Sequence, residues 1–336
     1  MVFCTHALGI PLLWMGVDLF FVISGYLITG ILLRLKERRS IGGGYWKPFY
    51  FRRVQRIIPP YIGFLIVLTF VFSVPWAHLW YWYLFFGANF ALALGKVNVA
   101  AMAPLWSLAV EEQFYFIWPW VVLLCDKRTL RRVACAVVLI SPVLRGVFTP
   151  IFTTHFPIYC LTIFRADTLA IGAFIAIAEE GDARWIERRR NTALGCAAGA
   201  LGLFGLCSMF ASFRTGANSL LFNSVGYSLS VILFSSVLVY TLGLREGFLH
   251  STLTARPVRY LGLVSYTFYL YHVAALLKAE QHAHSTIIAA ALAFAITIAI
   301  AAISWHFFES PILKLREKRE VFREPLPAKA EVLLEK

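Results

Sequence analysis

The chain has 336 residues, of which 60% are hydrophobic and only 15% are charged. In soluble domains, about a quarter of the residues are charged. This composition excludes an ordinary soluble domain and indicates an integral membrane protein. Apolar runs of about 20 residues, the length that crosses a hydrocarbon core, recur along the chain with short polar joints. They predict an all-α, polytopic bundle of transmembrane helices over residues 1–313, followed by a charged tail, 314–336.

The formal net charge is +13, but the basic residues stand between the apolar runs and form no single stripe, which disfavours nucleic-acid binding. Loops rich in Lys and Arg are typical of the cytoplasmic side of membrane proteins. If the loop 34–56 is cytoplasmic, the other basic joints and the C-terminus fall on the same side. The basic residues expected elsewhere are Lys96, Arg145, Arg165, Arg214 and Lys278.

About ten helices are expected in chain order. Residues 1–13 are apolar but too short to cross the membrane, so they are interpreted as the outer end of a truncated first helix. Either the assigned start of the chain is too late, or the protein is impaired. Pro59 and Pro60 are expected at the start of their helix, where proline is tolerated. The full spans are predicted at 17–33, 59–74, 104–125, 133–148, 161–178, 192–212, 223–243, 258–276 and 285–307.

The segment 78–94 is apolar and rich in aromatic residues, yet it does not fit a full crossing. A crossing there would move the basic joint 127–132 out of the cytoplasm. We therefore expect a re-entrant or interfacial segment, which membranes allow where protein or water covers the free backbone groups. The aromatic cluster at 80–83 is typical of a membrane interface.

Two ionisable residues stand near the first helix in an apolar surrounding, where charge is costly and indicates a function. His6 is either satisfied by a backbone carbonyl or interfacial water, or is a general base poised near neutral pH. Asp18 is a candidate to orient the imidazole of His6 or to bind a substrate hydroxyl. It could equally cap the helix that starts near it.

Three arginines, Arg52, Arg53 and Arg56, precede the proline pair. Arg53 and Arg56 are three residues apart and therefore share one face of a helix. They are either an ordinary basic flank of a membrane span or a clamp for phosphate, which guanidinium groups bind through paired hydrogen bonds. A nucleotide-bearing donor from the cytoplasm would use such a clamp.

Two adjacent carboxylates, Glu111 and Glu112, enter the apolar run 104–125. Ser107, Glu111 and Tyr115 recur at every fourth position, so they line one face of a helix. Interfacial solvation could accommodate Glu112. Both carboxylates together are hard to explain by packing, and this stretch is therefore predicted to be functional.

Polar residues also mark two later helices. Arg165 and Asp167 are two residues apart and do not face each other on a helix, so each is expected to have a different partner. Ser265, Tyr269 and His272 form a stripe at helical spacing, either an interhelical hydrogen-bond seam or the wall of a site. The seam is favoured for Tyr269, and the role of His272 stays open.

The six cysteines and the remaining histidines show no ligand spacing, so no metal site is predicted.

Taken together, these stretches resemble the membrane acyltransferase-3 family of bacterial O-acyltransferases, which modify surface polysaccharides and some secondary metabolites. They occur in the family's order and cover nearly the whole chain. An arginine that the family has before its catalytic histidine lacks a counterpart here. The matching stretches are His6, GVDLFFVISGYLIT (16–29), FRRVQRIIPPY (51–61), WSLAVEEQFY (106–115), FRADTLAIG (164–172) and SYTFYLYH (265–272).

The resemblance implies an enzyme of the bacterial inner membrane that moves an acyl group, most often acetyl, from cytoplasmic acyl-CoA to a hydroxyl of a glycan or secondary metabolite. Acyl-CoA is a co-substrate, and no permanently bound cofactor is implied. His6 matches the catalytic histidine and would act as general base, with Glu111 or Asp18 holding the imidazole or the acceptor. Arg52, Arg53 and Arg56 would bind the donor. The expected acceptor-binding residues are Ser107, Glu112, Tyr115, Arg165, Asp167, Tyr269 and His272.

Two other hypotheses stay open on the sequence. One is a transporter or exporter of an acylated or lipid-linked solute that uses the intramembrane carboxylates as a proton relay. The chain shows no paired halves of the kind many transporters have, and the arginine-rich loop argues against this hypothesis. The other is an inactive, truncated relative of the acyltransferases.

Overall fold

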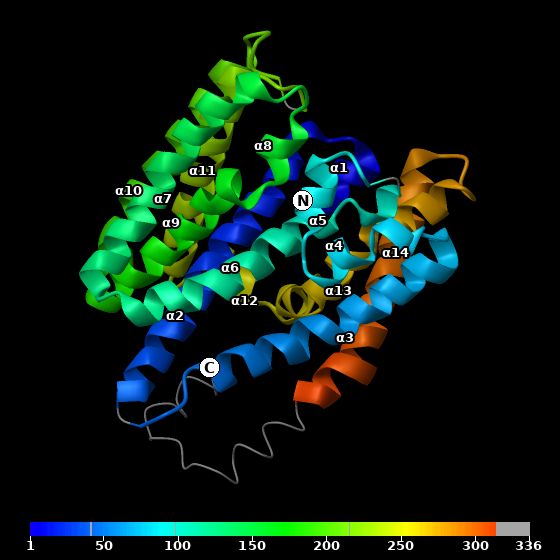
Figure 1. Cartoon of the computed structure of the whole chain (residues 1–336). Coiled ribbons are helices and arrows are strands. Elements are labelled where there is room, and N and C mark those ends of the chain that lie inside the picture. Colours follow the sequence, from blue (N-terminus) through cyan, green and yellow to red (C-terminus); the bar gives the residue numbers. More distant parts are fainter. Residues whose placement is uncertain (41, 98, 215, 314–336) are drawn as a thin grey trace.

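The computed structural model describes residues 1–40, 42–97, 99–214 and 216–313. Within these ranges the regular structure is helical and contains no strand (Figure 1). Eight helical segments in the described part of the chain are long and apolar enough to cross a membrane. The chain is therefore an all-α, multi-pass membrane protein, as predicted. The expected charged tail, 314–336, lies outside the described residues.

Every predicted span falls on one long helix, and within the described ranges five short helices lie before or between the long ones. The long helices are α2 (Gly16–Ser40), α3 (Trp46–Phe72), α6 (Leu105–Leu124), α7 (Lys127–Phe148), α9 (Thr162–Gly181), α10 (Trp185–Ser208), α11 (Tyr227–Leu242), α13 (Arg256–Glu280) and α14 (Thr286–Ser304). The short helices are α1 (Val2–Leu8), α4 (Trp80–Leu84), α5 (Ala88–Ala93), α8 (Phe156–Cys160) and α12 (Phe248–Thr254).

The predicted basic loop 34–56 is largely helical, which corrects the sequence-based boundaries. α2 continues to Ser40 and α3 already begins at Trp46, because the Leu, Lys, Glu and Arg residues near the end of α2 are good helix formers. Pro59 and Pro60 consequently lie inside α3 and not at its start.

The extension of α2 supports the end of α6. The Nζ atom of Lys36 donates hydrogen bonds to the carbonyl oxygens of Val122 and Cys125, at 2.8 and 2.6 Å. Carbonyl groups in the last turn of a helix lack partners within that helix. A lysine at this place satisfies them and balances the negative end of the helix dipole.

The aromatic segment 78–94 does not form one crossing helix. It consists of α4 and α5, separated by a turn in which Phe86 has a positive φ of 52°. Gln113 on α6 donates to the carbonyl of Phe86 at 2.9 Å, and the hydroxyl of Tyr61 on α3 donates to the carbonyl of Tyr83 at 2.8 Å. Long helices thus satisfy this irregular backbone, as a membrane-embedded segment requires.

The closest packing in the bundle joins α2 to α9. A Cβ atom added at Gly25 would lie 2.0 Å from the carbonyl oxygen of Leu169, and one added at Gly172 would lie 2.0 Å from that of Val22. Small residues permit such close approach between transmembrane helices. The pair α2 and α9 therefore forms the tightly packed centre of the molecule.

Two large hydrophobic cores lie on different faces of α2. One contains Phe21 and Ile28 together with residues of α3 and α6, and the other contains Val22 together with residues of α10 and α11. Figure 1 shows the corresponding division: α7, α10 and α11 gather on one side, α3, α13 and α14 on the other, with α2 and α6 between them.

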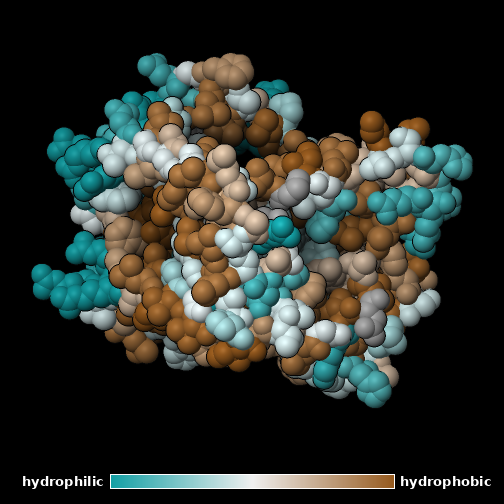
Figure 2. Space-filling model, turned by 90° about the horizontal axis from the view of Figure 1, so that it is seen from above, coloured by the Kyte–Doolittle hydropathy of each residue, from teal (hydrophilic) through white to brown (hydrophobic). Residues whose placement is uncertain are grey.

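Large apolar side chains cover much of the outer surface. Phe70, Leu124 and Leu139 are each at least 70% exposed, which is the expected arrangement for side chains that contact lipid. Seen from the end of the bundle that holds α1 and α8, hydrophilic residues gather in the middle of the face among hydrophobic ones (Figure 2).

Candidate active site

His6 is placed by the short helix α1, which packs against α13 and α14. The ring of Phe3 makes edge-on contacts with the rings of Phe268 and Phe294, at centroid distances of 5.8 and 5.6 Å. Nearly one turn after Phe3, the ring of His6 lies beside that of His272, with 5.4 Å between the centroids. The aromatic contacts of α1 thus bring two imidazoles together.

The environment of His6 suits a base. Its side chain keeps an exposed surface, while the helices around α1 remove part of its hydration. This desolvation disfavours the charged imidazolium and lowers the pKa of His6 from its ordinary value. Near neutral pH the ring is therefore neutral and able to accept a proton, as a general base must.

A hydrogen-bonded seam joins α13 to α6 next to the histidine pair. The hydroxyl of Tyr269 lies 2.5 Å from Ser107 Oγ and donates to the carbonyl of Pro104 at 3.1 Å. The ring of His272 lies 5.3 Å from that of Tyr269. The seam predicted for Tyr269 is confirmed, but Ser265 does not share it, because its hydroxyl donates to a carbonyl within α13.

A second polar group surrounds Glu111, one turn further along α6. Its carboxylate accepts hydrogen bonds from the hydroxyls of Ser24 on α2 and Tyr115 on α6, and the residue is only 4% exposed. The guanidinium carbon of Arg53 on α3 lies 5.1 Å from the centroid of the Tyr115 ring. Glu111 and Tyr115 therefore share one face of α6, as their spacing predicts.

The arginines of α3 lie near this carboxylate at different depths. Arg53 and Arg56 are both close enough to interact electrostatically with Glu111. Arg53 is half-buried, whereas Arg52 and Arg56 are exposed. Glu112 has a buried Oε1 atom without a hydrogen-bond partner among the described residues. This end of the bundle thus offers guanidinium groups at the surface and one that reaches inward.

The two polar groups are connected through α6. Ser107 and Tyr115 are about 12 Å apart along the helix axis, at about 1.5 Å per residue. Together they join the histidine pair at one end to the arginines at the other. We call this arrangement the polar line; its members are His6, His272, Tyr269, Ser107, Glu111, Tyr115 and Arg53.

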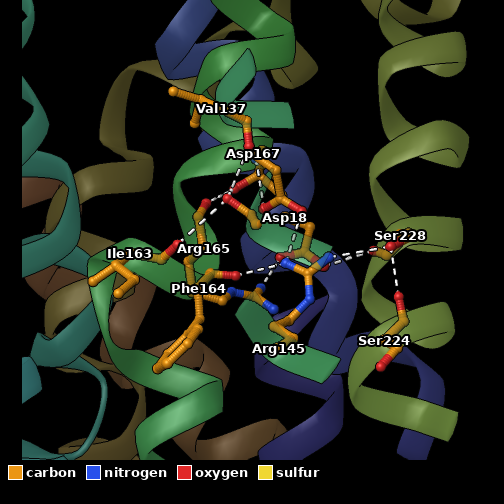
Figure 3. Close-up of polar contacts among 12 residues, drawn as sticks. Asp18, Val137, Arg145, Ile163, Phe164, Arg165, Asp167, Ser224 and Ser228 are labelled. Carbon is orange, nitrogen blue, oxygen red and sulfur yellow. Dashed lines mark hydrogen bonds and ion pairs between the residues drawn. The ribbon is translucent and has the colours of Figure 1, made fainter. Parts of the chain in front are cut away.

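A separate ion-pair cluster lies between α2, α7, α9 and α11 (Figure 3). Arg165 pairs with Asp18, and Arg145 pairs with Asp167 at 2.7 Å. Ser230 on α11 donates to the second carboxylate oxygen of Asp18 at 2.6 Å. The four charged side chains are at most 2% exposed, so this cluster is enclosed by the bundle.

Aromatic rings flank the arginines of the cluster. The guanidinium carbon of Arg165 lies 4.4 Å from the ring centroid of Tyr227 and 5.9 Å from that of Tyr159. That of Arg145 lies 5.5 Å from the ring of Tyr227. These positions allow cation–π attraction. Two positive and two negative groups balance one another, and the cluster ties four helices together.

The structure corrects the predicted role of Asp18. One of its carboxylate oxygens faces Arg165 and the other accepts from Ser230, so Asp18 neither orients His6 nor caps α2. Arg165 and Asp167 have different partners, which confirms that prediction. Both are buried in the ion-pair cluster rather than beside His6, and their contacts give no basis for binding a substrate. Spacing along one helix does not reveal which residues of other helices lie opposite.

Several contributors to these groups escaped the sequence-based prediction, among them Arg145 and Ser24. Arg145, which was only set apart from the cytoplasmic basic joints, is fully buried; its place within an apolar run was the available signal, because charged residues inside spans face the protein interior. Ser24, which donates to Glu111, carried no such signal. Serine is common in transmembrane helices, and its sequence position does not identify its partner.

Comparison with known proteins agrees with this arrangement. The profile of the acyltransferase-3 family, described as an acyltransferase domain, matches residues 2–306. No solved structure matches the chain.

Among curated proteins, the chain is 29% identical to the peptidoglycan O-acetyltransferase OatA of Listeria monocytogenes, over 90% of this chain and 51% of that protein. It is 27% identical to the putative peptidoglycan O-acetyltransferase YrhL of Bacillus subtilis, over 89% and 50%. It is 25% identical to the O-acetyltransferase OatA of Staphylococcus aureus, over 90% and 53%. The chain spans about half the length of these relatives. With the family profile covering most of its length, the chain belongs to the acyltransferase-3 family.

Proposed function

We propose that this chain is an O-acyltransferase that moves an acyl group, most often acetyl, from cytoplasmic acyl-CoA to a hydroxyl of a glycan on the other side of the bacterial inner membrane. The polar line is the observation that carries the proposal, because it connects the guanidinium group of Arg53 on α3 with a candidate base, His6, on α1. Relatives named for peptidoglycan O-acetylation make a peptidoglycan-like glycan the favoured acceptor class.

The donor binds at the arginine end in this proposal. Arg53 and Arg56 share one side of α3, and guanidinium groups form paired, charge-assisted hydrogen bonds with phosphate. The phosphates of CoA are the matching anions. The basic joints favour a cytoplasmic position for this end, because Lys and Arg are enriched on that side of membrane proteins, and acyl-CoA is found there.

The chemistry takes place at His6. The imidazole removes the proton of the acceptor hydroxyl while the oxygen attacks the thioester carbonyl. A new C–O bond forms, and a tetrahedral oxyanion develops, which nearby hydrogen-bond donors would stabilise. The C–S bond then breaks, and the proton held by His6 passes to the CoA thiolate. The products are an ester and free CoA.

A transfer assay with a matched histidine control tests the proposal. Inverted membrane vesicles that contain the full chain receive labelled acetyl-CoA, with soluble peptidoglycan fragments inside. We expect His6→Ala to lower ester formation by about 10²- to 10⁴-fold, the usual contribution of a general base. His282→Ala, at an exposed histidine after α13, should keep normal activity. Normal transfer by His6→Ala would overturn the proposal.

A further inference from the structure

The hydrogen bonds of His272 define which of its nitrogens carries the proton. Its Nδ1 atom lies 2.6 Å from the carbonyl oxygen of Tyr269. A carbonyl oxygen only accepts hydrogen bonds, so Nδ1 must be the protonated donor in a neutral ring. Nε2 is therefore the nitrogen with the free lone pair. It is buried, in a residue that is only 1% exposed.

This lone pair has no hydrogen-bond partner within the described part of the chain. An acceptor buried without a partner is costly, and an apolar residue would fill the same space more cheaply. The imidazole beside it is that of His6, at 5.4 Å between ring centroids. Two imidazoles joined by an N–H···N hydrogen bond have centroids about 5 Å apart, given an N···N distance of about 3 Å. The distance between the two rings thus permits a hydrogen bond between His6 and His272.

We propose that His272 is a positioning residue for His6, with its Nε2 accepting a hydrogen bond from the ring N–H of His6. This bond fixes the tautomer of His6 and leaves its other nitrogen free to take the proton of the acceptor hydroxyl. The inference rests on the proposed function, because it assigns a helper to the same base. It also explains how the base is oriented although Asp18 is occupied elsewhere.

A neutral partner suits this place in the fold. In hydrolase triads a buried carboxylate orients the histidine, but an ionised carboxylate needs compensating charges or hydrogen bonds when it is buried. His272 avoids that cost, since its Nδ1 proton is satisfied by the carbonyl of Tyr269. The seam from Tyr269 to Ser107 in turn holds this part of α13 against α6.

Two conservative variants test the bond. His272→Gln keeps an acceptor oxygen near the position of Nε2, whereas His272→Asn can keep the contact with the Tyr269 carbonyl but has no acceptor at that distance. We expect His272→Asn to lower kcat at least about tenfold, as loss of an orienting partner does. His272→Gln should retain several times more activity than His272→Asn, and the KM for acetyl-CoA should stay unchanged in both. Equal activity of the two variants would overturn the inference.

A double-mutant cycle separates this inference from the proposed function. If His272 acts through His6, His272→Asn should cause no further loss in the His6→Ala background, measured with long incubations. A loss of the same factor in both backgrounds would show an independent or purely structural role and refute the inference. Normal activity of His6→Ala alone would instead refute the proposed function. Thermal unfolding of each purified variant verifies that the protein is folded.

Discussion

His6 determines the pH dependence of the proposed reaction. Its pKa is lowered by desolvation, and only the neutral ring accepts a proton, so the active form persists at lower pH than for a free imidazole. We expect the rate to rise from acid and to reach half of its plateau below the ordinary value of about 6.5. Initial transfer rates at each pH test this. A midpoint above about 7 would contradict it, and reassay at neutral pH after acid exposure controls for inactivation.

Arg53 offers a separate test at the donor end. Loss of a charge-assisted hydrogen bond to phosphate costs about 1.5–3 kcal/mol, so Arg53→Gln should raise the KM for acetyl-CoA by about 10- to 100-fold. Arg53→Lys keeps the positive charge but loses the paired hydrogen bonds of the guanidinium group. Its KM for acetyl-CoA should lie between those of the unchanged protein and Arg53→Gln. Arg131→Gln, at an exposed arginine of α7, is the control for surface charge. An unchanged KM in Arg53→Gln would remove this residue from the donor site.

At the scale of helices, the contact between α2 and α9 makes a prediction for stability. Gly172→Ala places a Cβ atom against the carbonyl of Val22, and such overpacking costs about 1–3 kcal/mol or more. Thermal unfolding in detergent should show a clear loss. Gly199→Ala on α10, with nothing within 4 Å of its Cβ position, should unfold at the same or a higher temperature. Equal unfolding temperatures for both variants would contradict the packing argument.

The ion-pair cluster makes a second prediction for the helices that it joins. Asp18→Asn leaves Arg165 buried without its counter-charge, which costs about 3–5 kcal/mol for a buried pair. Replacing both residues, as Asp18→Asn with Arg165→Gln, removes the unpaired charge and should restore part of the lost stability. The same unfolding measurement compares the two variants. A double variant less stable than Asp18→Asn would contradict this account.

The helices were predictable from the sequence, but their lateral partners were not. The length of the apolar runs and the spacing of Ser107 and Tyr115 predicted the spans and one polar face of α6. Asp18 and Arg165 meet across 147 positions of the chain, and Ser107 meets Tyr269 across 162. Periodicity reports which face of a helix is polar, whereas only the packing of several helices determines what that face meets.

At the scale of the whole molecule, the basic joints predict which end faces the cytoplasm. The six cysteines are unpaired and can be replaced before single cysteines are introduced. In spheroplasts, a membrane-impermeant maleimide should label His282→Cys directly and Lys47→Cys only after permeabilisation, because these exposed positions lie at opposite ends of the bundle. The reverse labelling pattern would contradict the proposed orientation, because Arg53 and Arg56 would then face away from cytoplasmic acyl-CoA.

The last long helix has a consequence at the level of the gene. α14 carries none of the proposed chemistry, yet Phe294 holds Phe3, and Ala289 and Ala293 pack in one cluster with Ala7. A premature stop codon just before α14 would leave every residue of the polar line in place. It would remove the surface against which α1, the helix that carries His6, packs. Such an allele should therefore be a null, although the sequence motifs of the family would all remain intact.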